Sequence, residues 1–596
     1  MVGFANDEGI FGSVGRLFMK LPARRRRQLV GVLGLMLVGA VAEVMALGAV
    51  LPFLGLIADP GRVSHYPLLA RAFQLLGWRD TGSLLIPATI LFVTVAILAG
   101  AVRILLSWTS TRFVFSVGYD LGTQVYWRML HQPYRYHLGR NTSEVVAAIS
   151  KVQTVTNGVL LPLMQGMTSI IIGLFIVATL IFVNPVVSLT AFGAFGALYA
   201  GVAYAAQRRL RANSKVIAAT ATLRVQAVQE GLGGIRDVLI DSTQAVFLRK
   251  FARYDQQLRR AQATNTFIAA FPRFAIEAAG MVLIALMALY MNTRPGGLAG
   301  ALPVLGALAL GAQRLLPLMQ LIYTGRTQLV GNRQVLQDVL DLLEAPIPEE
   351  YLPDTPREPV PFEKSIALKN VWFAYDSATP VLRNLNFTIR KGAKVGFIGK
   401  TGSGKSTTID LIMGLLEPTK GSVQIDGKAL NARTRRGWQQ QIAHVPQAIF
   451  LSDSSIAENI AFGVDREKVD MDRVREAARK AALSEFIEAM PQQYDTAVGE
   501  RGVRLSGGQR QRIGIARALY KRASVLVFDE ATSALDNQTE SAVMEAIAAL
   551  GRDLTVILIA HRLSTVAVCD EVIRLEAGEV ADKGDYEQVV LKAQAS

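Results

Sequence analysis

Cysteine is nearly absent from this chain of 596 residues, and Cys569 is the only one. A single cysteine excludes an internal disulfide and any metal cluster that is built on several thiolates. The N-terminus is also predicted to lack a cleavable signal, because the apolar run after the arginines at 24–27 is longer than the h-region of such a signal. We expect this run to remain in the protein as a membrane anchor, with the arginine cluster on the cytoplasmic side.

Acidic residues are scarce in the first half of the chain. Residues 1–345 hold 31 Lys and Arg against 15 Asp and Glu, whereas residues 346–596 hold 32 against 33. The chain is 51% hydrophobic with a mean hydropathy of +0.30, and the apolar runs lie in the same half as the excess positive charge. This coincidence favours a membrane protein with basic cytoplasmic loops over a nucleic-acid binder.

Six apolar runs are long enough to cross a membrane, which takes about 20 helical residues. They cover residues 29–57, 84–107, 158–183, 186–206, 263–290 and 298–323. Two long arginine-rich stretches with a helical pattern, 110–157 and 207–262, separate the second run from the third and the fourth from the fifth. Their positive charge predicts that both stretches and the N-terminus are cytoplasmic. Residues 1–343 are therefore predicted to form a six-span α-helical membrane domain.

The first outer loop has an apolar face. In residues 64–80 six apolar residues share roughly one helical face, and Trp78 follows: Leu68, Leu69, Ala72, Phe73, Leu75 and Leu76. This pattern is typical of a short amphipathic helix on the outer leaflet, and equally of a helix packed on the ends of the spans.

A proline-rich segment separates the two halves of the chain. Residues 344–364 contain six prolines and are predicted to be a linker before an α/β P-loop nucleotide-binding domain at 365–596. The sequence GKTGSGKST at 399–407 follows a strand-like run and begins a helix-like run, which is the context that a P-loop requires. Its predicted ATP-binding residues are Gly399, Lys400, Thr401, Gly402, Ser403, Gly404, Lys405, Ser406 and Thr407. Lys405 would neutralise the β- and γ-phosphates, and Ser406 would offer its hydroxyl to Mg²⁺.

A second acidic motif, SVLVFDE at 524–530, ends a buried strand. Such a strand would deliver Asp529 to the Mg²⁺ shell. Glu530 beside it is placed to polarise a water for in-line attack on the γ-phosphate.

The segment RLSGGQRQRIGIARAL at 504–519 resembles the signature of ATP-binding-cassette (ABC) ATPases. Other stretches of 365–590 match the same family in order, including the exporter loop TAVGERG at 496–502. By this resemblance Tyr375 stacks on adenine, Gln447 is the Q-loop residue that serves catalysis and metal binding, and Asp536 lies in the D-loop. His561 matches the switch histidine.

The resemblance also implies an assembly. Ser506, Gly507, Gly508 and Gln509 would serve the γ-phosphate of ATP held by a second copy of the chain, so that a homodimer carries two complete sites with Mg²⁺. Six spans before one cassette resemble an ABC exporter half-transporter with long cytoplasmic helical extensions. The segments 132–141 and 231–243 resemble the coupling segments that sit on the cassettes, and ATP would drive alternating access.

Three arginines interrupt the predicted spans at a similar depth. At 1.5 Å per residue, Arg314 lies about 24 Å, Arg103 about 28 Å and Arg273 about 27 Å from the outer end of its span. Guanidinium groups suit phosphate or pyrophosphate oxygens, which accept paired N–H donors. Three other interpretations stay open: the arginines reach inner-leaflet headgroups, they lie just outside the membrane on helices that continue past it, or Glu277 neutralises Arg273 from four residues away.

The first span and the segment QEGLGGIRDVLI resemble the lipid-linked oligosaccharide flippases of bacterial protein N-glycosylation. This resemblance implies an ATPase that moves a polyprenyl-pyrophosphate-linked oligosaccharide across the bacterial inner membrane. It also implies that residues 64–78 and the three arginines meet the lipid-linked substrate. The alternative is a multidrug, peptide or phospholipid/lipid A exporter of the same architecture. An ATP-gated channel or regulatory subunit is disfavoured by Glu530 and His561.

Overall fold

The computed structural model describes eight segments of the chain: 10–58, 85–183, 185–292, 297–352, 360–376, 379–529, 554–559 and 563–595. These residues form two compact units. The first comprises residues up to 131 and 140–346, and the second comprises 132–139 and 347–596. The predicted outer helix at 64–78 lies outside the described residues.

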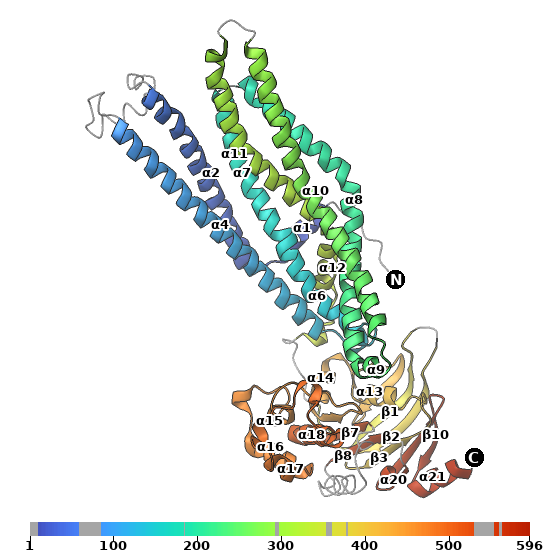
Figure 1. Ribbon diagram of the computed structural model, residues 1–596. Helices are drawn as coiled ribbons and strands as arrows, with labels where there is room; N and C mark the ends of the chain where they lie inside the picture. The colour runs from blue at the N-terminus through green and yellow to red at the C-terminus, as the bar shows by residue number, and fades with distance from the viewer. Residues whose placement is uncertain are drawn as a thin grey trace. The chain divides into compact units, whose positions relative to one another are not determined.

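The first unit is entirely helical (Figure 1). Its helices are α1 (Ile10–Met19), α2 (Ala23–Ala58), α4 (Leu85–Leu130), α6 (Thr142–Val155), α7 (Leu161–Val183), α8 (Pro185–Gly233), α9 (Ile235–Ile240), α10 (Gln244–Asn292), α11 (Gly297–Gly331) and α12 (Arg333–Glu344). A π-helical turn, η3 (Thr156–Leu160), joins α6 to α7. Among the described residues, three stretches are long and apolar enough to cross a membrane: Ala23–Val50, Ala88–Leu130 and Thr142–Phe182.

The long helices of this unit pack in pairs. Helix α2 lies along α4, α7 along α11, and α8 along α10, and the first pair diverges from the others toward the C-terminal end of α2 (Figure 1). Between α2 and α4 the backbones come close, because a Cβ on Gly39 would lie 3.0 Å from Cδ2 of Leu106.

Polar contacts fasten α8 to α10. The Arg224 guanidinium donates to Asp255 at 3.1 Å, and Asn213 donates to Asn265 at 2.8 Å. Each of the two helices has 49 residues, which corresponds to about 73 Å at 1.5 Å per residue. Because the hydrocarbon layer is about 30 Å thick, both helices are much longer than one crossing requires.

A buried apolar cluster holds the polar ends of these helices together. Amphipathic α12 buries Val335, Leu336, Val339, Leu340 and Leu343 against α4, α6 and α8. At the π turn, a Cβ on Gly118 would lie 2.5 Å from Oγ1 of Thr156, so glycine permits this approach of α4.

The second unit contains two sheets. The four-stranded sheet has the order β2-β1-β4-β5, and its strands are β1 (Ser365–Phe373), β2 (Leu382–Arg390), β4 (Lys420–Ile425) and β5 (Lys428–Ala429). The six-stranded sheet has the order β10-β9-β3-β8-β7-β6. Its strands are β3 (Lys394–Ile398), β6 (Ile442–Val445), β7 (Val525–Asp529), β8 (Thr555–Ile559), β9 (Glu571–Glu576) and β10 (Glu579–Gly584).

The central strands of the larger sheet are parallel. Strand β3 pairs in parallel with β8 and β9, and β7 pairs in parallel with β6 and β8. These strands are short continuous apolar runs, as expected for a sheet that is covered on both faces. The carboxyl ends of β3, β6 and β7 therefore meet at one edge, where ligands of such sheets bind.

Helices complete the second unit. They are α5 (Tyr134–Leu138), α13 (Lys405–Ile412), α14 (Ala432–Gln440), α15 (Ile456–Ile460), α16 (Met471–Lys480), α17 (Ser484–Glu488), α18 (Gly507–Lys521), α20 (Leu563–Val566) and α21 (Tyr586–Ala595). The linker is fastened to α14, because Arg435 donates to the Tyr351 hydroxyl at 3.0 Å and Arg436 donates to the Leu352 carbonyl at 2.7 Å.

Candidate functional site

The P-loop connects β3 to α13 through glycines that no other residue could replace without strain. Gly399 has φ 146° and Gly404 has φ 100°. A Cβ at Gly399 would lie 2.2 Å from the Leu575 carbonyl oxygen, and one at Gly404 would lie 2.4 Å from Cδ2 of Leu382. Lys405 is the first residue of α13, so the positive end of the helix dipole adds to its charge.

The polar groups of this loop fit a phosphate. Lys405 is buried, and its ammonium lies inside the loop, donating to the Gly399 carbonyl at 2.7 Å and the Lys400 carbonyl at 3.1 Å. The Ser403 hydroxyl is buried and has no hydrogen-bond partner among the described residues. A buried hydroxyl without a partner is unfavourable, and a phosphate oxygen would satisfy it.

Tyr375 lies beside this loop. Its hydroxyl is 3.2 Å from Oγ1 of Thr407, and its ring packs edge-on against Phe373 with the centroids 4.9 Å apart. The residue is 41% exposed, so part of the ring is accessible for stacking.

Carboxylates gather at the same edge of the sheet. Asp529 ends β7, and Asp410 projects from α13. Burial and, to a smaller extent, the negative charge of Asp529 together raise the pKa of Asp410 to about 6. Because two neighbouring anions repel each other, a divalent cation that is bound there would be stabilised.

The donor set fits Mg²⁺ with a nucleotide. Exposed Ser406 and Asp529 would offer hard oxygen ligands, and Mg²⁺ in such sites takes its remaining ligands from phosphates and water. The described residues include no cluster of three or more His, Cys, Asp or Glu that could hold a metal ion. Gln447 follows β6 and is exposed.

The signature residues begin α18. Ser506 is the N-cap: its hydroxyl accepts from the backbone N–H of Gln509 at 3.2 Å, and the Gln509 side chain accepts from the Ser506 N–H at 2.8 Å. This capping box places Gly507 and Gly508 in the first turn, where N–H groups have no intrahelical partner. Glu530, Asp536 and His561 lie outside the described residues.

Helix α5 belongs to the second unit, and it brings a residue that the sequence did not single out. Arg135 donates from Nη2 to the Tyr375 carbonyl at 2.5 Å. Burial raises the pKa of the neighbouring Tyr134, and the charge of Asp410 adds to this shift. The first predicted coupling segment, 132–141, thus contacts the loop that carries the adenine residue. The second, which contains α9, belongs to the first unit.

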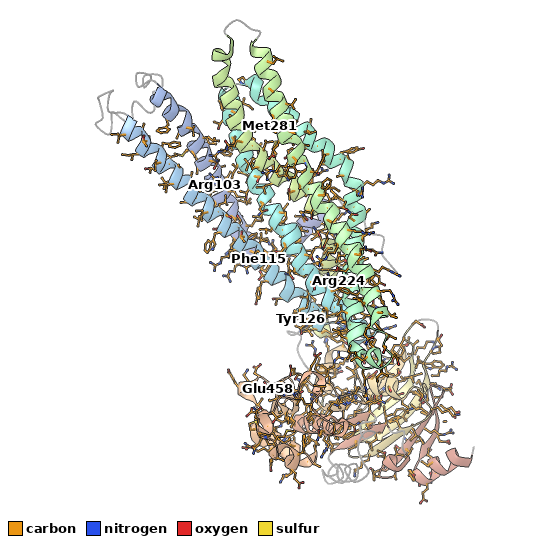
Figure 2. All side chains as sticks on the ribbon, in the orientation of Figure 1. Arg103, Phe115, Tyr126, Arg224, Met281 and Glu458 are labelled. Atoms are coloured by element: carbon orange, nitrogen blue, oxygen red, sulfur yellow. The ribbon has the colours of Figure 1, made fainter. Side chains whose placement is uncertain are left out.

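The first unit brings two of the three predicted substrate arginines together. Arg103, labelled on α4 in Figure 2, lies 2.8 Å from Oε2 of Glu43. Arg314, on α11, lies 2.9 Å from the other carboxylate oxygen. Among the described residues, Arg273 forms its ion pair with Glu277 on its own helix at 2.8 Å and not with Glu43.

Glu43 was not singled out from the sequence, although its position within an apolar run could have drawn attention to it. It is an acidic residue in the apolar run at 29–57, where a charge costs about 3 kcal/mol or more. The reasoning that singled out the arginines therefore applies equally to this carboxylate.

Comparison with known proteins decides the family. Residues 382–533 match the family model described as ABC transporter, and residues 33–292 match the ABC transporter transmembrane region. An ATP-dependent lipid A-core flippase of Cupriavidus metallidurans is 30% identical over 519 residues, which cover 84% of each chain. The chain belongs to the ABC transporter family.

Other similar proteins agree with this assignment. An ATP-dependent lipid A-core flippase of Alkalilimnicola ehrlichii is 33% identical over 459 residues, which cover 76% of this chain and 74% of that protein. The structure of a bacterial Atm1-family ABC exporter with ATP bound superposes with a TM-score of 0.75 at 25% identity. The match covers 95% of this ABC transporter and 96% of that chain.

Several predictions about this ABC transporter are confirmed. It has the ABC exporter fold, with a helical transmembrane domain before a nucleotide-binding domain, and it is an ATP-driven translocase of a membrane. The names of its relatives agree better with the predicted alternative, export of phospholipid or lipid A, than with an oligosaccharide-linked substrate.

Proposed function

We propose that this ABC exporter flips an anionic amphiphilic lipid, with a phosphorylated lipid of the lipid A type as the first candidate. The observation that carries the proposal is the pair of arginines at Glu43. Arg103 and Arg314 come from different apolar helices, and their side chains are 53% and 40% exposed. Exposed guanidinium groups on apolar helices match a ligand that combines acyl chains with phosphate.

In this proposal ATP hydrolysis requires two copies of the chain. Both would lie in the bacterial inner membrane, with the N-termini and the cassettes in the cytoplasm. In this proposal the P-loop of one copy holds ATP with Mg²⁺ through Lys405, Ser406 and Asp529. Gly507 and Gly508 of the other copy would contact the γ-phosphate with their N–H groups. Glu530 would polarise the attacking water, and Gln447 and His561 would be the other catalytic residues.

The test is a flipping assay in proteoliposomes with a lipid A-type phosphoglycolipid and an uncharged glycolipid of similar acyl composition. We expect ATP-dependent flipping of the phosphoglycolipid and little of the uncharged one. Arg103→Gln and Arg314→Gln each remove charge-assisted hydrogen bonds to phosphate, so each should lower flipping about tenfold. Arg326→Gln, an exposed position on the same helix α11, is the matched control and should stay within twofold.

The second candidate substrate is a polyprenyl-pyrophosphate-linked oligosaccharide. It is favoured by the two guanidinium groups that share one carboxylate, because a pyrophosphate offers two adjacent anionic groups. The same proteoliposomes distinguish the two candidates, since flipping of the polyprenyl substrate and not of the phosphoglycolipid would replace the first proposal by the second. Equal flipping of charged and uncharged lipids would contradict both.

A further inference from the structure

Glu43 is the buried member of the charged cluster in the first unit. Its side chain is 9% exposed, against 53% for Arg103 and 40% for Arg314. The carboxylate therefore lies behind the two guanidinium groups, and the cations are the groups that face outward. A ligand would meet the arginines before it could reach the acid.

The pairing is divided between the two carboxylate oxygens. Arg103 Nη2 is 2.8 Å from Oε2, and Arg314 Nη1 is 2.9 Å from Oε1. Two cations and one anion leave a net charge of +1. Each guanidinium has five N–H donors, and one nitrogen of each is engaged in these ion pairs. Donors on both arginines thus remain for an anionic group.

Close packing fixes the position of Glu43. One turn before it on α2, Ala40 is fully buried and belongs to an apolar cluster with Ile172, Ile176 and Leu315. On the other side, Gly39 is in close contact with Leu106, three residues after Arg103. The carboxylate is therefore held where α2, α4 and α11 meet, and its ion pairs orient arginines from two different helices.

The pair Arg273–Glu277 differs in each of these respects. Both residues lie on α10, four residues apart, and their side chains are 63% and 43% exposed. Such an exposed ion pair within one helix contributes little to stability, and it does not join two helices by an ion pair. It serves as an internal reference for what the Glu43 cluster adds.

We propose that Glu43 is a positioning residue for a phosphate- or pyrophosphate-binding site. In this proposal it holds Arg103 and Arg314 side by side, with their exposed N–H groups directed at the anionic group of the amphiphile. Without the carboxylate, the two cations would repel each other and separate. The inference rests on the proposed function, because it assigns a role within the same substrate site.

The experiment measures ATPase stimulation of the full-length protein in proteoliposomes as a function of probe concentration. The probes are a polyprenyl pyrophosphate, a phosphorylated lipid A-type glycolipid and, as the uncharged reference, the free polyprenol. For Glu43→Gln we expect the half-stimulating concentration of an anionic probe to rise about tenfold, as for other residues that orient ligand-binding side chains. Glu43→Asp keeps the charge but is one methylene shorter, so its rise should be smaller, about threefold.

A double-mutant cycle separates positioning from a general packing effect. In the background Arg103→Gln/Arg314→Gln, Glu43→Gln should cause no further change in the half-stimulating concentration, because there is nothing left to orient. Glu277→Gln is the matched control on α10 and should leave it unchanged. An effect of Glu43→Gln that persists in the double-arginine background would overturn the inference.

The outcomes distinguish this inference from the proposed function. If the wild-type protein responds equally to the polyprenol and to both anionic probes, the proposed function fails. If it prefers an anionic probe and Glu43→Gln keeps or lowers the half-stimulating concentration, the inference alone fails. If Glu43→Gln does not fold, Glu43→Asp decides, because a folded Asp variant with the wild-type value would also overturn the inference.

Discussion

The cassette and the membrane unit handle buried charge in opposite ways. In the cassette, Lys405 donates to the Gly399 and Lys400 carbonyl oxygens of its own loop, which are only six and five residues away along the chain. In the membrane unit, Glu43 meets Arg103 and Arg314, which are 60 and 271 residues away along the chain. The first arrangement can be recognised from one contiguous motif, whereas the second exists only after three helices have packed.

The largest effect that would sharpen this comparison is expected at Lys405. Lys405→Ala removes the ammonium from the P-loop, and the loss of one charged group aimed at a transferring phosphoryl lowers turnover about 100-fold or more. ATP hydrolysis by the purified protein measures it. Lys391→Ala, an exposed lysine in the turn before β3, is the control and should keep the wild-type rate. A near-normal rate of ATP hydrolysis by Lys405→Ala would contradict the role of this ammonium in the cassette.

An intermediate effect is expected at Asp410. Its pKa in the folded protein is raised to about 6, so the ionised form is disfavoured in the folded state. Below about pH 4 Asp410 is protonated in both the folded and the unfolded state and does not lower the free energy of unfolding. As the pH rises through about 6, its ionisation lowers the free energy of unfolding. Asp410→Asn should therefore stabilise the nucleotide-free cassette by about 1–2 kcal/mol at pH 7.5 and make little difference at pH 4.

The measurement is the midpoint of the cassette unfolding transition in the full-length protein at the two pH values, with a chelator present. Asp376→Asn, on the exposed loop beside Tyr375, is the control variant. A stabilisation by Asp410→Asn that is the same at both pH values would contradict the titration and indicate a packing effect.

The smallest effect is expected at Arg273. Arg273→Gln removes an exposed ion pair within one helix, so the thermal midpoint and the flipping rate should change little, the rate by less than about twofold. Comparison with Arg314→Gln in the same flipping assay checks this. A loss at Arg273 as large as that at Arg314 would show that all three arginines act on the substrate, as the similar depth of the three predicted.

Much of the cassette could be predicted from the sequence, because its chemistry depends on backbone geometry that a few residues dictate. Gly399 and Gly404 have positive φ values, and the loop that they permit brings Lys405 inward. The neighbourhood of Asp410 and Asp529 was not predicted, since it depends on how α13 lies against the sheet.

The membrane unit was less predictable for a physical reason. Depth along a helix follows from residue number at 1.5 Å per residue, and this was enough to relate Arg103 to Arg314. The rotation of each helix about its axis is set by packing, and only the packed helices reveal Glu43 between the two arginines. The third arginine was expected at the same site, but its nearest acid is one turn away on its own helix.

The paired helices α8 and α10 have a mechanical consequence. Polar contacts such as Arg224–Asp255 join them side by side, and each is about 73 Å long at 1.5 Å per residue. Because the helices are so long, tilting the pair as a unit by about 5° at one end displaces the other end by about 6 Å. A small rotation at one end of this helix pair would therefore be enough to move a group at the other end by several ångströms.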